Sequence, residues 1–267
     1  MHSALPVLVP AGSSSSCRHL VARPCGQRRS QGRQAALPMN RRSAHTALGT
    51  LGSLALIGGS LGVAGLVRAA TATPAKDPRQ LVSTGMQKFR RNDVEGAVED
   101  LDAAWAAAPS LRPYLWQRGL ALYYLGRYEE AGTQFRSDVA VNPNDTEEAI
   151  WAYIAEARIL GPEAASKQFL EVGRDSRPIM RAAYQAFQGA GPDKIKVAIT
   201  DDSGGTCFYG NLYIALWHEA QGSLQEAEAR VAMEAACATQ YAQTSGDYMA
   251  ALARVHCKRR GWNAGAE

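Results

Sequence analysis

The chain has 267 residues, of which 46% are hydrophobic and 20% charged, a balance that suits one globular domain with appendages. Its net charge of +4 is unevenly distributed: nine of the 29 Lys and Arg precede Asp77, whereas all 25 carboxylates lie at or after it, so the net charge from Asp77 onward is −5. A basic head on an acidic body argues against a nucleic-acid-binding domain, which would concentrate basic charge on its folded part, and favours a cationic targeting segment on a soluble protein.

The first 39 residues are rich in Ser, Arg, Ala, Gly and Pro and include no acidic residue. Such a composition cannot bury enough apolar surface to build a core, so we expect residues 1–39 to be disordered. The segment resembles an organellar transit peptide, and the signal that follows it points to the chloroplast.

Residues 40–72 combine paired arginines, an uncharged run and a cleavage motif. Arg41 and Arg42 precede the run 43–67, which contains six glycines, and Ala72 ends an Ala-x-Ala motif. These features resemble a twin-arginine export signal that is cleaved after Ala72. A transit peptide followed by such a signal is the two-stage address of thylakoid-lumen proteins in plants and algae, so we expect the mature protein in the thylakoid lumen.

The run 43–67 leaves two alternatives open. Its 25 uncharged residues exceed the roughly 20 that a membrane-spanning helix needs, so the run could persist as a thylakoid-membrane anchor with the protein facing the lumen. Its glycines and the Ala-x-Ala motif favour removal, and we therefore expect no stable membrane insertion after processing. A bacterial periplasmic location is the other alternative, although a long Ser/Arg-rich lead is unusual there.

A 34-residue period organises the chain from Leu81 to Pro143. Small residues, a larger apolar residue and a closing proline recur at this offset as the pairs Gly85 and Gly119, Ala97 and Ala131, Leu101 and Phe135, and Pro109 and Pro143. The pattern resembles tetratricopeptide (TPR) repeats, each of which is a helix–turn–helix unit. We expect the small residues to let paired helices approach closely, Phe135 to fill the space between units, and the proline to end the second helix.

Later segments keep parts of this period. Ala165 and Phe169 stay in phase, but Tyr153 stands where the second unit has its glycine. One hairpin cannot bury its own apolar face, so several units must stack. The predicted fold of residues 73–267 is therefore an all-α TPR solenoid, a right-handed superhelix of hairpins. Its expected parts are repeats at about 79–109, 113–143 and 145–177, a degenerate pair at 178–200, a further pair at 206–239, and a capping helix at 246–260.

The order of these features is similar to that of bacterial TPR lipoproteins of the NlpI type and their chloroplast relatives. The resemblance implies an all-helical adaptor, because the bacterial members bring partner proteins to proteases. A lipoprotein carries a cysteine just after its signal, whereas this region reads Ala70-Thr71-Ala72-Thr73. Lipid anchoring is therefore not expected.

The motifs found after residue 72 do not predict a catalytic or metal-binding site. His218-Glu219 begins like the zinc-protease pattern H-E-x-x-H, but Gly222 stands at the position of the second histidine. The loop 202–205 (Asp-Ser-Gly-Gly) resembles the surroundings of a serine-protease nucleophile, without the framework and partner residues that a triad needs. We therefore expect no enzyme activity, no metal site, no cofactor and no nucleic-acid partner.

Three cysteines remain once the targeting segments are removed: Cys207, Cys237 and Cys257. Their spacing fits no zinc motif. An oxidising compartment would permit one disulfide, for which Cys237 and Cys257, on adjacent predicted helices, are the better pair. Three buried thiols are the alternative.

TPR solenoids bind peptides or partner segments on a concave groove that the first helix of each pair lines. Trp, Tyr and Arg, which dominate interface energetics, are frequent at the matching positions of this chain. The alternative is that part of this set forms the core between repeats. The predicted groove residues are Met86, Phe89, Arg90, Trp116, Gln117, Leu120, Tyr123, Tyr124, Ile150, Trp151, Ile154 and Arg158.

These observations predict a non-catalytic adaptor or assembly scaffold of the thylakoid lumen that binds a protein or peptide partner in an apolar, aromatic groove. The location suggests photosystem assembly, repair or a lumenal protease as the process it serves. Two alternatives remain open. One is a structural protein whose aromatic surface makes a homo-oligomer, and the other is a membrane-anchored TPR protein with an uncleaved N-terminal helix.

Overall fold

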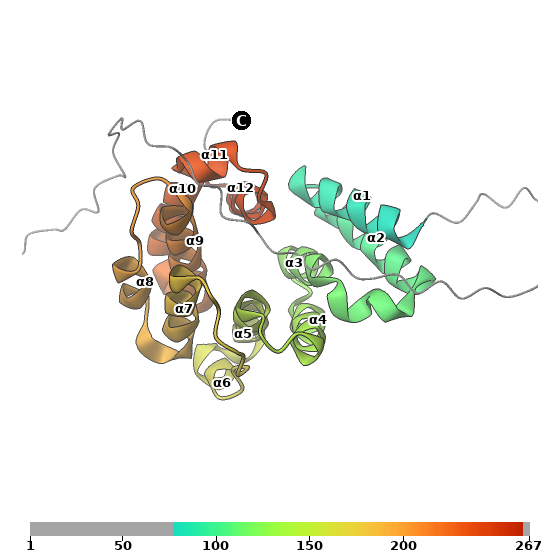
Figure 1. The fold of residues 1–267 in the computed structure, drawn as a ribbon, viewed down its shortest axis with the longest axis horizontal. Helices are drawn as coiled ribbons and strands as arrows, with labels where there is room; N and C mark the ends of the chain where they lie inside the picture. The colour runs from blue at the N-terminus through green and yellow to red at the C-terminus, as the bar shows by residue number, and fades with distance from the viewer. Residues whose placement is uncertain (1–76, 264–267) are drawn as a thin grey trace, which may run out of the picture.

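The computed structural model describes residues 77–263, and every regular element in that range is a helix (Figure 1). This confirms the predicted all-α class for the described part of the chain. The predicted targeting segments, residues 1–72 with Arg41, Arg42 and Ala72, lie outside the described residues.

Most of the helices pack in consecutive pairs joined by short turns, with α1 against α2, α3 against α4, and α9 against α10. The α-helices are α1 (Pro78–Arg90), α2 (Val94–Ala107), α3 (Trp116–Tyr124), α4 (Tyr128–Val141), α5 (Thr146–Leu160), α6 (Pro162–Ser166), α7 (Pro178–Gln185), α8 (Asp193–Val197), α9 (Gly205–Ala220), α10 (Glu226–Ala238), α11 (Gln240–Thr244) and α12 (Tyr248–Arg260). Two 3-10 helices, η1 (Pro109–Tyr114) and η3 (Ser223–Gln225), and a π-helix, η2 (Ala186–Ala190), complete the described elements.

Aspartates fix the starts of α1, α2 and α5, and a fourth, Asp247, does so for α12. Asp77 accepts a hydrogen bond from the backbone N–H of Arg79 at 2.9 Å, and Asp93 accepts one from Gly96 at 3.0 Å. Asp145 does the same for the first turn of α5. The first N–H groups of a helix have no partner within it, so each such cap contributes about 1 kcal/mol.

The predicted close approach of paired helices is confirmed at both glycines of the 34-residue period. A Cβ atom at position 119 would lie 2.7 Å from Cζ of Phe135, and one at position 85 would lie 2.9 Å from Cγ of Leu101. Both distances are too short for a real Cβ, so glycine sets the helix separation in each pair. The buried Phe135 ring also stacks on Trp151 of α5, with centroids 6.1 Å apart, and so joins the second unit to the third.

The third unit differs from the expected full hairpin. Its second helix, α6, spans only five residues, and the chain continues without regular structure to Pro178. The physical reason is that Ala165 is the only buried residue between 161 and 168, so this stretch has no apolar stripe that would hold a longer helix. The phase residues still pack, since Phe169 meets the Tyr153 ring edge-on at 5.7 Å.

The C-terminal part follows the predicted order with two differences. The degenerate pair is divided into α7, η2 and α8, and the short α11, which was not predicted, precedes α12. The final helix begins at Tyr248, two residues later than expected. It ends at Arg260 and is followed by Gly261, whose φ of +68° is the left-handed conformation that favours glycine after a helix.

Helix α12 brings the C-terminal end of the described fold back to its beginning. In Figure 1 the helices run from α1 and α2 through α3, α4 and α5 to α9 and α10, and α12 lies between the two ends of that path, in contact with α10 and α1. It therefore covers the last hairpin, as expected of a capping helix, and also the first. Between residues 77 and 263, none of the helices combines the length and apolarity that crossing a bilayer requires.

Candidate functional site

The inner surface of α1 and α3 is aromatic, and α9 and α12 pack against it. We call this surface the groove. Its aromatic residues are Phe89, Trp116, Tyr123 and Tyr124; Trp116 is half-buried and the other three are buried. Within the described chain, the occupant of the groove is thus the protein's own C-terminal region.

Asp247 fixes the start of α12. Its Oδ1 accepts a hydrogen bond from the backbone N–H of Met249 at 2.9 Å, so it is the N-cap of the helix. Its Oδ2 accepts hydrogen bonds from the hydroxyl groups of Tyr209 and Tyr241, both at 2.7 Å. Because these tyrosines belong to α9 and α11, the C-terminal helices hold the first turn of α12 against the groove.

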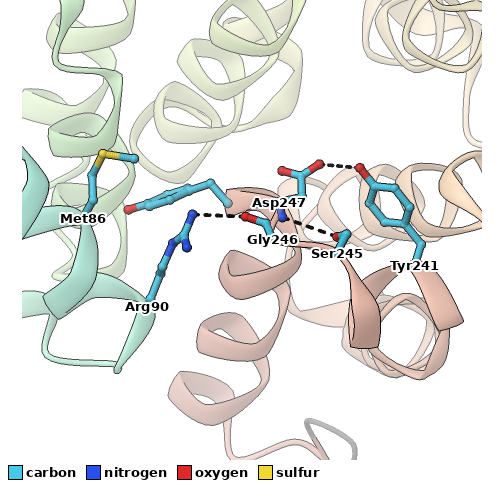
Figure 2. A pocket seen from close by; sticks show the side chains of 7 residues that line it. Met86, Arg90, Tyr241, Ser245, Gly246 and Asp247 are labelled. Atoms are coloured by element: carbon cyan, nitrogen blue, oxygen red, sulfur yellow. Dashed lines mark hydrogen bonds between the residues drawn. The ribbon is translucent and has the colours of Figure 1, made fainter. Parts of the chain in front are cut away.

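Tyr248 is the apolar anchor of α12. Its ring stacks on Phe89 with centroids 5.5 Å apart, and it meets Trp116 edge-on at 5.1 Å. The Arg90 guanidinium lies 5.3 Å from the centre of the same ring and donates from Nη2 to the carbonyl of Gly246 at 3.3 Å (Figure 2). Each aromatic pair contributes about 0.5–1.5 kcal/mol beyond the area it buries.

Glu219 of α9 is the polar centre of the site. Its Oε1 accepts hydrogen bonds from the Tyr123 hydroxyl of α3 and from Nη2 of Arg260 of α12, both at 2.5 Å. Its Oε2 lies 2.8 Å from Nε2 of His256, also on α12. One carboxylate therefore joins three helices that are far apart in the sequence.

Burial requires a proton at the contact between Glu219 and His256. Oε2 of Glu219 and Nε2 of His256 are buried and have no other partner, so a proton on Nε2 is needed to satisfy both atoms. The Tyr124 hydroxyl lies 3.0 Å from Nδ1 of His256, and either atom can donate, depending on the tautomer. The contacts therefore run from Tyr124 through His256 to Glu219.

Burial and charge shift the pKa values of these groups in opposite directions. Burial alone would raise the pKa of Glu219, but its contacts with His256, Arg260 and Tyr123 hold that pKa well below the ordinary value of a glutamate. Burial raises the pKa of the Tyr123 hydroxyl far above its ordinary value, and the charge of Glu219 raises it further. Glu219 is therefore ionised and Tyr123 neutral at physiological pH.

A second ionic contact joins α12 to the first hairpin. Arg259 donates to both carboxylate oxygens of Glu95, at 3.1 and 2.8 Å, and to Oδ1 of Asn92 at 3.1 Å. The Glu95 side chain is 62% exposed, so solvent screens this pair and it contributes little to stability. Its geometry nevertheless fixes the end of α12 against the turn between α1 and α2.

A pocket of about 400 Å³ opens at the seam between α1 and the start of α12. Met86 and Arg90 line it from α1, and Tyr241 and residues 245–248 line it from the other side (Figure 2). The charged groups of the pocket already have partners, because Arg90 bonds Gly246 and Asp247 bonds Tyr241. The pocket therefore marks the edge of the α12 interface.

The structure corrects the prediction of an open groove. Arg90 and Arg158 are exposed, and Met86 and Trp116 are half-buried. The physical reason is twofold: α12 covers Phe89 and Tyr124 and α9 contacts Tyr123, whereas Trp151 packs between repeats against Tyr123 and Phe135. The remaining predicted groove residues are buried: Phe89, Gln117, Leu120, Tyr123, Tyr124, Ile150, Trp151 and Ile154.

Of the two weak motifs in the sequence, only Glu219 belongs to this site; His218 and Ser203 make local contacts. Nδ1 of His218 contacts Oε1 of Gln225 at 2.6 Å, on the half-buried side of the α9–α10 turn. Ser203 Oγ accepts a hydrogen bond from the backbone N–H of Gln240 at 2.7 Å and serves the loop structure. Among residues 77–263 there is no group of three His, Cys, Asp or Glu side chains arranged to hold a metal ion.

Sequence reasoning missed the Glu219 network. Glu219 was considered only as part of a failed zinc motif, and His256 and Arg260 were not considered as partners. One signal was present: Leu212, Leu216 and Glu219 follow each other at helical spacing, so a carboxylate stands on the apolar face of α9. The sequence does not show which groups from α3 and α12 would meet it.

Comparison of the sequence with protein-family models and with curated proteins gives no match. The site itself is an aromatic surface with α12 seated on it and the buried carboxylate of Glu219 at its centre.

Proposed function

We propose that this protein is a non-catalytic adaptor of the TPR class, which binds an α-helical segment of a partner protein in the groove where α12 lies. One observation carries the proposal: α12 sits on the groove as a peptide ligand would, with an aromatic anchor in its first turn and arginines in its last. Helix-in-groove binding is a common mode of peptide recognition.

The TPR assignment is supported by the two glycines of the 34-residue period. In each hairpin the glycine of the first helix packs against a large apolar residue of the second helix, Gly85 against Leu101 and Gly119 against Phe135. The two residues of each pair are equally far apart in the sequence. A solenoid of similar units requires such a contact to recur from one unit to the next. The short α6 and the divided α7–α8 region depart from the repeat and make the later units irregular.

The chemistry of the groove indicates which partner it would take. Phe89 and Trp116 would stack on an aromatic residue in the first turn of the partner helix, as they do on Tyr248. Glu219 would pair with an arginine about three turns further on, as it does with Arg260. The partner segment would therefore be an amphipathic helix with an aromatic N-terminal end and a basic C-terminal end, and it would compete with α12.

We also propose that the mature protein acts in the thylakoid lumen. The proposal rests on the sequence of residues 1–72, with Arg41 and Arg42 before the apolar run and Ala72 at the cleavage motif. Photosystem assembly or repair and lumenal proteolysis are the processes that such a location offers to an adaptor.

A synthetic helix tests whether the groove accepts a ligand from outside. The probe is a fluorescent peptide with the sequence of residues 245–262, added to the protein in which Tyr248→Ala weakens the hold of α12. We expect the variant to bind the probe at least about tenfold more tightly than the wild-type protein does, because an intramolecular competitor weakened by about 1.4 kcal/mol shifts binding tenfold. Fluorescence anisotropy measures the binding.

Two controls make this result specific. Tyr114→Ala removes a 62% exposed aromatic from η1 and should leave probe binding as in the wild-type protein. A probe that itself carries Tyr248→Ala should bind the weakened variant poorly. If the Tyr248→Ala protein keeps its helical circular dichroism but does not bind the probe, the groove is not a helix-binding site and the proposed function fails.

A further inference from the structure

The side of α12 that packs on α10 carries a pair of thiols. Cys257 of α12 and Cys237 of α10 have their Sγ atoms 3.8 Å apart, and both residues are buried. A disulfide has an S–S distance of about 2.05 Å, and changes in side-chain torsion can close such a gap because the two helices are already in contact. The two cysteines are therefore placed to bond without a rearrangement of the fold.

We propose that Cys237 and Cys257 are a redox-controlled disulfide site that locks α12 onto α10. Other residues of α12 face the groove: Tyr248 stacks on Phe89 of α1, and His256 contacts Tyr124 of α3. A covalent bond on the α10 side would keep α12 in place and so keep the groove filled. This consequence rests on the proposed function, whereas the disulfide itself does not.

The reaction is a dithiol–disulfide exchange with a low-molecular-weight disulfide or a disulfide oxidoreductase. The thiolate of one cysteine attacks a sulfur of the oxidant, forms a mixed disulfide and releases the first oxidant thiol. The second thiolate then attacks the protein sulfur of the mixed disulfide and releases the second oxidant thiol. The two cysteines lose two protons and two electrons in total, and the oxidant disulfide takes up both.

The surroundings favour Cys237 as the first nucleophile. The S–H group of Cys257 can donate to the sulfur of Cys237, and this hydrogen bond lowers the pKa of the Cys237 thiol. Both sulfurs are buried where α12 packs on α10, so an oxidant reaches them when α12 moves away from α10. The rate of oxidation should therefore report how often α12 leaves its place.

The test uses the full chain, equilibrated in buffers with graded ratios of reduced to oxidised glutathione. We expect peptide mapping without reduction to show a bond between Cys237 and Cys257. The oxidised protein should melt roughly 6–12 °C higher than the reduced protein, because the bond closes a loop of about 20 residues in the unfolded chain. The difference should persist in Cys207→Ser and vanish in Cys257→Ser.

Two results would overturn the disulfide site: a bond that includes Cys207, or complete alkylation of Cys237 and Cys257 after oxidation at a temperature that opens the fold. A third result, an oxidised protein that contains the bond but melts no higher than the reduced one, would overturn the claim that the bond locks α12. The wild-type comparison decides all three, so the test does not depend on the folding of a variant.

A second arm tests the effect on the groove. It uses the Tyr248→Ala chain, oxidised or reduced, and the 245–262 probe with Cys257→Ala so that the probe cannot cross-link. We expect at least tenfold weaker probe binding in the oxidised state. Equal binding in both states would overturn the inference that the bond guards the groove. Absence of binding in both states would overturn the proposed function and leave the disulfide site standing.

Discussion

Replacement of Glu219 by glutamine should loosen α12 from the rest of the fold. The carboxylate accepts hydrogen bonds from the Tyr123 hydroxyl and the Arg260 guanidinium, both at 2.5 Å, and lies 2.8 Å from Nε2 of His256. Glutamine has nearly the same shape but no charge, and its NH₂ group cannot accept a hydrogen bond. At least one of the three donors around position 219 then lacks an acceptor, and the arginine loses its counter-charge.

The size of the effect follows from burial. Removal of one partner from a fully buried ion pair costs about 3–5 kcal/mol. The Arg260 side chain is 27% exposed, so water recovers part of that cost, and we expect a loss of about 2–4 kcal/mol in the free energy of unfolding at pH 7. For a domain of this size the melting temperature should fall by about 4–16 °C.

The pH dependence of this loss distinguishes a charge effect from a packing effect. The pKa of Glu219 in the folded protein is below its unfolded value, so the carboxylate contributes stability that is fully present above the unfolded pKa. That contribution is lost as the pH falls from about 5 toward the folded pKa. The difference between wild type and Glu219→Gln should therefore be constant from pH 6 to 8 and shrink below about pH 5.

Urea denaturation followed by circular dichroism, repeated at pH 4, 5, 6 and 7.5, measures the difference. Glu163→Gln is the matched control, because Glu163 pairs with Lys167 on the surface and its side chain is 91% exposed; it should change stability by less than about 0.5 kcal/mol. If Glu219→Gln unfolds at the same urea concentration as the wild type, or if its deficit does not shrink in acid, the network does not hold α12 as described.

Two further changes test the repeat and a buried acid. Gly119→Ala places a Cβ 2.7 Å from the buried Phe135 ring and should destabilise the fold by about 1–3 kcal/mol; Gly132→Ala, whose nearest contact would be an ordinary 3.4 Å, should be neutral or slightly stabilising in the same thermal melts, and equal effects would contradict the packing argument. Asp138→Asn should stabilise the protein at pH 8.5 and have little effect near pH 4. Burial raises the pKa of Asp138 to about 8, so its contribution is present at low pH and lost as the pH rises to that value; urea midpoints that do not separate between the two pH values would refute the assignment.

The sequence alone determined the local structure of this protein. Helical spacing of apolar residues, glycines at a 34-residue interval and aspartates before helix starts are properties of short segments, and the helices, their caps and the close contact of Gly119 with Phe135 follow from them. The proximity of Cys237 to Cys257 could also be expected, because only the short α11 separates their helices along the chain.

Only the tertiary structure decided where the last helix would lie. Repeat patterns specify contacts between one unit and the next, but the contacts of α12 with α1 and α3 join residues more than 100 positions apart, as Tyr124 and His256 show. A buried aromatic looks the same in a sequence whether it faces the next repeat, a partner or the protein's own C-terminus. The folding of α12 over the groove, and the carboxylate of Glu219 that holds it there, therefore had to be seen in three dimensions.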